Sequence, residues 1–244
     1  MAFAVFDIET RIDKRLLNQV FFPRDNLSDE EAYERFRQDP RNRSGDFMPL
    51  TLHLPIAIVI GEVGDDYVLR SVDNLPMADY SEENLVRAFW HRLESFDGVL
   101  VSFNGRGFDL PVLELAALRY GISAPRYFAS DSRRNRESED HLDLYDYLTN
   151  CGVTGLRGGM NLLLKMIGMD GKTDLDGSKV QPYFEAGRLD EIRRYCRADV
   201  IRTYALLLRV ELMRGRIDEA TYRAVCAASA PFIREIEAQP SGKS

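Results

Sequence analysis

Two acidic residues interrupt an apolar run at the beginning of the chain. The run reads MAFAVFDIET, and Asp7 and Glu9 stand two positions apart within it. Side chains two apart share one face of an extended strand, so both carboxylates point the same way. Two carboxylates held together repel, and a divalent cation between them removes that cost. Oxygen ligands of this kind suit Mg²⁺ or Mn²⁺, although surface acids are the commoner origin of so short a pattern.

A second acidic position follows a buried strand in the middle of the chain. In SFNGRGFDLPVL (102–113) the strand ends at Asn104, a glycine-rich turn follows, and Asp109 opens a helix. An aspartate before a helix is first of all an N-cap. Ligands also bind where the strands of an open sheet end, so Asp109 is a candidate for the same site.

A third motif, YCRAD (195–199), lies in a late amphipathic segment. Tyr195 and Asp199 are four apart and therefore share one helix face. The apolar stripe of Ile192, Val200 and Tyr204 places Asp199 near the core side of this helix. The alternative is a tyrosine–aspartate hydrogen bond that only supports packing.

The three motifs in this order resemble those of the DEDD exonuclease superfamily. FDIET, N-x₄-D and Y-x₃-D match its DEDDy branch, which has tyrosine in the last motif. The segments HLDLYD, GLRGGMNLLLKMIGMDGK, DGSKV and YCRADVIRTYALLLR are similar to predicted 3′–5′ exonucleases related to the proofreading domain of family B DNA polymerases. The resemblance covers about residues 1–215 and implies an α/β, ribonuclease H-like fold, a mixed sheet flanked by helices.

The resemblance also implies an activity and a role for each matched residue. The activity is metal-dependent 3′–5′ hydrolysis of phosphodiester bonds at the 3′ ends of single-stranded DNA or RNA, with two Mg²⁺ or Mn²⁺ ions per site. Asp7, Glu9 and Asp199 would bind one ion. Asp7 would bridge to the second, which Asp109 helps to hold through water. Tyr195 would orient the attacking water, since a tyrosine with its usual pKa of about 10 is a poor base at neutral pH.

Residues around the second motif are candidates for substrate binding. Phe103 and Phe108 could stack on a terminal base, and Arg106 beside Asn104 could meet a phosphate. Core packing is the alternative for both phenylalanines. Lys172 lies in the loop before the last long helix and could line the path of the strand.

The local patterns predict strands first and helices last. Expected strands are 2–8, 55–63, 66–72 and 98–104; expected helices are 27–38, 81–96, 110–121, 160–169, 188–215 and 217–238. Residues 141–148 fit either state, and 173–184 read as a loop. We expect one exonuclease-like domain over 1–244, with about 10–54 inserted after the first strand and 239–244 as a polar tail.

Composition narrows the functional classes. A net charge of −7 argues against a broad nucleic-acid-binding surface, but it allows an enzyme that holds a few nucleotides. Three cysteines without CxxC spacing predict reduced thiols and a cytoplasmic location. Apolar runs fall short of the ~20 residues that a membrane helix needs, so we expect no membrane association. A non-catalytic nucleic-acid-binding accessory protein and a phosphohydrolase of nucleotides are the alternatives, and the sequence names no protein partner.

Overall fold

The computed structural model describes residues 1–39, 48–75, 80–130, 135, 136, 138–169 and 177–237 of the 244-residue chain. The strands are β1 (Ala2–Ile12), β2 (His53–Val63), β3 (Leu69–Asn74), β4 (Gly98–Ser102) and β5 (His141–Asp143). The helices are α1 (Lys14–Phe21), α2 (Asp29–Gln38), η2 (Leu50–Leu52), α3 (Glu82–Ser95), α4 (Asp109–Tyr120), α5 (Pro125–Ala129), α6 (Leu144–Thr149), α7 (Gly159–Met166), η4 (Gly177–Lys179), α8 (Val180–Glu185), α9 (Leu189–Met213), α10 (Glu219–Ala228) and α11 (Ala230–Glu237). Lys172 and the tail 239–244 lie outside the described residues.

The sheet is mixed, as the sequence predicts, and β1 is its central strand. Its order is β3-β2-β1-β4-β5. β1 pairs antiparallel with β2 and parallel with β4, and a hairpin joins β2 to β3. The parallel pairing is short, because it runs only from Ala2–Gly98 to Val5–Val101. Beyond Val5, β1 therefore projects past its neighbour β4.

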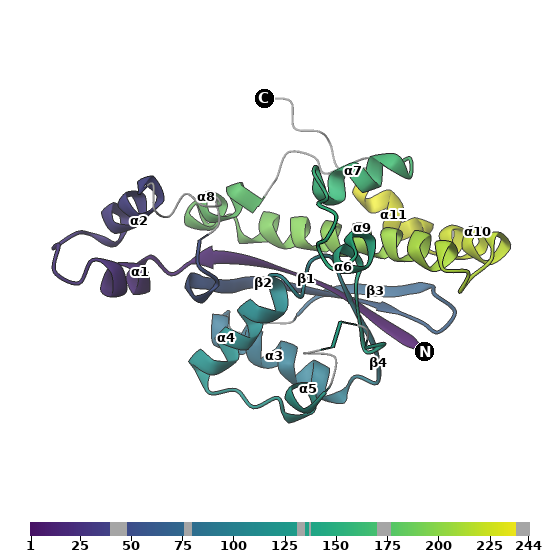
Figure 1. Ribbon diagram of the computed structural model, residues 1–244, viewed down its shortest axis with the longest axis horizontal. Coiled ribbons are helices and arrows are strands. Elements are labelled where there is room, and N and C mark those ends of the chain that lie inside the picture. The colour runs from purple at the N-terminus through teal and green to yellow at the C-terminus, as the bar shows by residue number, and fades with distance from the viewer. Residues whose placement is uncertain (40–47, 76–79, 131–134, 137, 170–176, 238–244) are drawn as a thin grey trace.

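Alternation along β1 divides the core into two layers. Phe3 and Val5 belong to the core that includes α9, whereas Ala4, Phe6 and Ile8 belong to the core that includes α3 and α4. Figure 1 shows the same division, with α9 along one face of the sheet and α3, α4 and α5 on the other. Asp7 and Glu9 continue the odd-numbered series, so the period-two pattern directs them toward α9.

The helix α9 packs unusually close to the sheet at one point. A Cβ atom built on Gly61 of β2 would lie 2.9 Å from Cγ1 of Val200, the residue after Asp199. Glycine at this position therefore allows the helix to approach the strand. The helix itself follows the predicted 188–215 closely.

The segment between β1 and β2 forms a small cluster of its own at the end of β1. The core of this cluster consists of Ile12, Leu17, Ala32, Phe36 and Leu52. The predicted helix 27–38 is confirmed as α2, with a complete capping box between Ser28 and Glu31. In Figure 1, α1 and α2 extend from the arrowhead end of β1 beside α8. Gln181 of α8 accepts a 2.7 Å hydrogen bond from the backbone N–H of Ile12.

Several predicted boundaries differ from those observed. β1 ends at Ile12, four residues later than expected, and 141–148 divides into β5 and α6. The expected loop 173–184 contains α8 from Val180 onward. The expected helix 217–238 is two helices, because Pro231 lacks an N–H and its ring clashes with the carbonyl of the preceding turn. Among the described residues, no helix is long and apolar enough to span a membrane.

Candidate metal centre

Three carboxylates converge between β1 and α9. Asp7, Glu9 and Asp199 each offer one oxygen, and these oxygens all lie within 4.8 Å of one another. Glu9 and Asp199 are buried, with 9% and 3% of their surface exposed. The thiol of Cys196 donates to the backbone oxygen of Asp7 at 3.3 Å, which ties the helical turn before Asp199 to the strand. Three carboxylate oxygens in this arrangement, two of them from buried residues, fit a divalent cation such as Mg²⁺ or Mn²⁺.

Asp109 is held beside this group by the backbone of β1, although its oxygens are not among the three that converge. Its Oδ1 accepts a 3.2 Å hydrogen bond from the N–H of Ile8, the residue between Asp7 and Glu9. Because β4 pairs with β1 only as far as Val5, this N–H has no strand partner in β4. The N-cap alternative is wrong, since Phe108 is the N-cap residue, no side chain caps the helix, and Asp109 is the first helical residue.

The electrostatics of the site reflect its burial and its concentration of acids. The pKa of Asp109 is raised to about 7, chiefly by burial; backbone N–H donors oppose the rise, and the charges of Asp143 and Asp199 add to it. Burial also raises the pKa of Tyr195 far above its usual value, followed by the charges of Asp199, Glu9 and Asp7. Tyr195 is therefore a neutral phenol beside the carboxylates, able to donate a hydrogen bond but not to act as a base.

The turn before Asp109 is held by Asp143, at the end of β5. Its two carboxylate oxygens accept the N–H groups of Asn104 and Arg106, each at 2.8 Å. The same carboxylate caps α6 through the N–H of Tyr145 at 2.9 Å. The turn is tight, since a Cβ on Gly105 would lie 2.4 Å from the hydroxyl of Ser102. Asp143 thus fixes the path of the chain that leads into Asp109.

The predicted substrate residues of the turn occupy different environments. The side chain of Asn104 is exposed, and its backbone has a left-handed φ of 66°. Phe103 is half-buried and packs edge-on against Tyr145, with ring centroids 5.9 Å apart. Phe108 is half-buried as well and packs edge-to-face with His53, with ring centroids 5.0 Å apart.

Arg106 is turned toward β5 and α6. One of its nitrogens donates to the backbone oxygen of His141 at 2.9 Å, and another lies 3.8 Å from Asp146. It lines a cavity of about 560 Å³ together with Arg136, Arg214 and Arg216. Among the described residues, the lining of this cavity contains none of the three converging carboxylates.

Two residues of the site are given no role by the sequence, although Cys196 lies within the YCRAD motif. Arg202 is 3% exposed, and its guanidinium donates to Oδ1 of Asp199 at 2.9 Å. Cys196, described above, is fully buried on α9, where it contacts the backbone of Asp7. The sequence does hold one feature that could have indicated Arg202: it is the single charged residue in the mostly apolar stretch VIRTYALLL, three residues after Asp199.

The chain matches a family model over residues 45–243. That family is described as predicted 3′–5′ exonucleases related to the exonuclease domain of PolB. The chain belongs to this family. The matched segment includes Asp109, Tyr195 and Asp199, whereas Asp7 and Glu9 precede it. No curated protein shows a significant match.

Comparison with solved structures confirms the α/β, ribonuclease H-like fold that the sequence predicts. The family B DNA polymerase of the hyperthermophilic archaeon Pyrobaculum calidifontis superposes with a TM-score of 0.55 at 17% identity. The match covers 98% of this chain and 27% of that chain, so this chain spans about a quarter of the polymerase. Exonuclease I of E. coli in complex with a dT13 oligonucleotide gives a TM-score of 0.39 at 15% identity, covering 87% of this chain and 42% of that one.

Proposed function

We propose that the protein is a metal-dependent 3′–5′ exonuclease that shortens single-stranded nucleic acid. The observation that carries this proposal is the convergence of Asp7, Glu9 and Asp199 within 4.8 Å, beside a neutral Tyr195. The hydrogen bond from Ile8 to Asp109 brings a fourth carboxylate to the same length of β1. Family membership supports the reaction class, since its relatives are predicted 3′–5′ exonucleases.

Each residue has a distinct role in the proposed reaction. Asp7, Glu9 and Asp199 would hold one divalent cation, with Asp7 shared by a second that Asp109 helps to hold. Two such cations lower the pKa of an attacking water and stabilise the leaving oxygen. Tyr195 would hold that water by a hydrogen bond from its phenol and, being neutral, would not remove its proton. Asp143 keeps Asp109 in place through the turn that precedes it.

The substrate contacts follow from which parts of the turn are accessible. We infer that exposed Asn104 contacts the terminal nucleotide, and that the half-buried rings of Phe103 and Phe108 offer an edge or face to its base. Arg106 would contribute a phosphate contact only if it left the carbonyl of His141. Lys172, which the sequence suggests lines the path of the nucleic-acid strand, stays a proposed substrate contact.

The experiment is degradation of 5′-labelled single-stranded DNA and RNA oligomers with Mg²⁺ or Mn²⁺. We expect a ladder that shortens from the 3′ end, and no ladder when the 3′ end carries an inverted nucleotide. Asp7→Asn and Asp199→Asn should lose both hydrolysis and Mn²⁺ binding, whereas the matched surface change Glu219→Gln, at a side chain 76% exposed, should alter neither. Wild-type turnover by a contaminant-free Asp7→Asn protein would refute the mechanism.

A change at Tyr195 separates catalysis from metal binding. Tyr195→Phe removes the phenolic hydroxyl but no carboxylate. Mn²⁺ affinity should therefore equal that of the wild type, while the rate of hydrolysis falls about 10²-fold. The matched control is Tyr147→Phe, at a tyrosine 44% exposed on α6. Release of phosphate from mononucleotides, with intact oligomers, would instead support a nucleotide phosphohydrolase. Tight oligomer binding without hydrolysis under either metal would support an accessory binding protein.

A further inference from the structure

Arg202 places a positive charge inside the protein directly behind the carboxylate cluster. It lies three residues after Asp199 on α9, and 3% of its surface is exposed. Its Nη1 donates to Oδ1 of Asp199 at 2.9 Å. Its Nε is buried and has no hydrogen-bond partner among the described residues. The guanidinium is therefore bound mainly through one carboxylate oxygen.

Fold stability alone is a poor explanation for this pair. Removing two charges from water is costly, and apolar side chains of similar volume often serve equally well in place of a buried ion pair. Most of the neighbouring positions of α9, such as Val200, Ile201 and Leu206, are buried and apolar, so a leucine or methionine would be an ordinary residue at this position. Because the guanidinium is incompletely hydrogen-bonded, the better explanation for an arginine at this position is the effect of its positive charge on the carboxylate cluster.

The effect of that charge can be deduced from the neighbouring acids. Asp7, Glu9 and Asp199 repel one another when no cation is present, since their oxygens lie within 4.8 Å. Arg202 offsets part of that repulsion from inside the protein, and the same charge opposes any cation that enters. It also donates to Oδ1 of Asp199, which restrains the orientation of that carboxylate.

We propose that Arg202 is a positioning residue that holds Asp199 and weakens divalent-cation binding at the cluster. The inference rests on the proposed function, because it requires the cluster to bind a metal. Its consequence is a site that binds cations loosely when empty of substrate and fills further when a phosphate adds negative charge. Loss of the charge at position 202 should then tighten metal binding, whereas simple structural damage would not.

The test is a titration of two variants with Mn²⁺ alone, in which the electron paramagnetic resonance signal of the free ion measures how much Mn²⁺ remains unbound. Arg202→Gln keeps an N–H donor for Asp199 and removes the charge, so Mn²⁺ should bind at least about tenfold more tightly. Arg202→Lys keeps the charge and should bind Mn²⁺ as the wild type does. Thermal unfolding of each variant establishes that it is folded before the titration.

The outcomes distinguish this inference from the proposed function. Tighter binding by folded Arg202→Gln with wild-type binding by Arg202→Lys supports the inference. Equal or weaker binding by folded Arg202→Gln, when the wild type binds Mn²⁺ and Asp7→Asn does not, overturns the inference and leaves the proposed function in place. A wild-type protein that binds no Mn²⁺ overturns both.

Discussion

Replacement of Asp143 by alanine tests how the turn before Asp109 is held. The Asp143 side chain is 4% exposed and accepts the N–H groups of Asn104, Arg106 and Tyr145 at 2.8, 2.8 and 2.9 Å. Each buried donor left without an acceptor costs about 1–3 kcal/mol, and the helix cap is worth about 1 kcal/mol. Because water can reach part of this turn, we expect Asp143→Ala to lower the free energy of unfolding by roughly 3–5 kcal/mol.

The same change should also reduce activity, because the turn leads directly into Asp109. A displacement of about 1 Å in a positioning group can cost on the order of 10²-fold in rate. We expect at least about a tenfold lower rate of hydrolysis in the protein that stays folded. Asp143→Asn keeps one acceptor oxygen but turns an amide group toward a backbone N–H, so it should lie between wild type and Asp143→Ala in both measurements.

The assay combines urea unfolding followed by circular dichroism with degradation of labelled oligomers below the unfolding transition. Asp97→Ala serves as the control, since the Asp97 side chain is 98% exposed. An Asp143→Ala protein with wild-type stability would refute the hydrogen-bond accounting. A destabilised variant that keeps full activity would show that the turn does not position Asp109.

Three further predictions concern the fold around the site. Ser28→Ala breaks the capping box of α2 and should cost about 1 kcal/mol, seen as faster hydrogen exchange in α2. Gly61→Ala adds a Cβ 2.9 Å from Val200 and should cost ~1–3 kcal/mol in urea unfolding, whereas Gly155→Ala, with open space around it, should be close to neutral. Burial, then the charge of Arg106, lowers the pKa of His141 from 6.5 to about 3. Between pH 6.5 and 3 the unfolded chain therefore binds a proton at His141 that the folded chain does not. The free energy of unfolding should fall as pH decreases through this range, by at most roughly 5 kcal/mol. His141→Gln should remove that loss when urea unfolding is measured across this pH range. A variant whose stability falls with decreasing pH as much as that of the wild type would contradict the prediction.

Periodicity was sufficient to predict the parts of the site that lie on regular elements. Period two along β1 places Asp7 and Glu9 on one face, and the apolar stripe of α9 places Asp199 toward the core. Both elements are long and strongly apolar, so their type is clear from local sequence. Their meeting could be expected only from the resemblance, because no local pattern relates a strand to a helix about 190 residues later.

The parts that could not be predicted depend on contacts between distant segments. Asp109 is an ordinary N-cap candidate by sequence, and its bond to Ile8 spans 101 positions. The role of Asp143 requires β5 to lie beside β4, and β5 has only three residues. The break between α10 and α11 is a different case, because Pro231 is a local signal for it; Ser229 at the break also shares a hydrogen bond with the hydroxyl of Tyr204 on α9.

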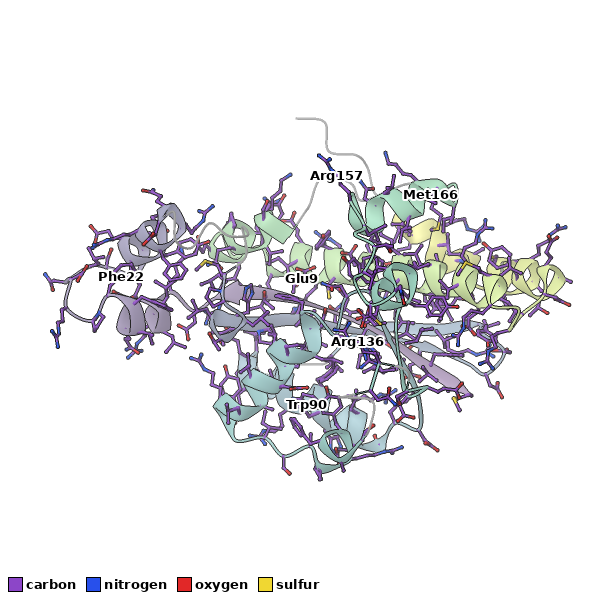
Figure 2. All side chains as sticks on the ribbon, in the orientation of Figure 1. Glu9, Phe22, Trp90, Arg136, Arg157 and Met166 are labelled. Atoms are coloured by element: carbon purple, nitrogen blue, oxygen red, sulfur yellow. The ribbon has the colours of Figure 1, made fainter. Side chains whose placement is uncertain are left out.

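The position of the candidate site follows from where one strand pairing stops. β4 pairs with β1 only through Val5, so the rest of β1 continues without it. The first consequence is that the N–H of Ile8 becomes available to Asp109, which draws α4 toward the carboxylates. The second is that the far end of β1 can bind α8 through Ile12 and Gln181. Figure 2 shows Glu9 near the centre of the molecule and Phe22 far out beside α1 and α2. A strand held by helices on both sides of its carboxylates is a rigid support, as two like charges held close together require.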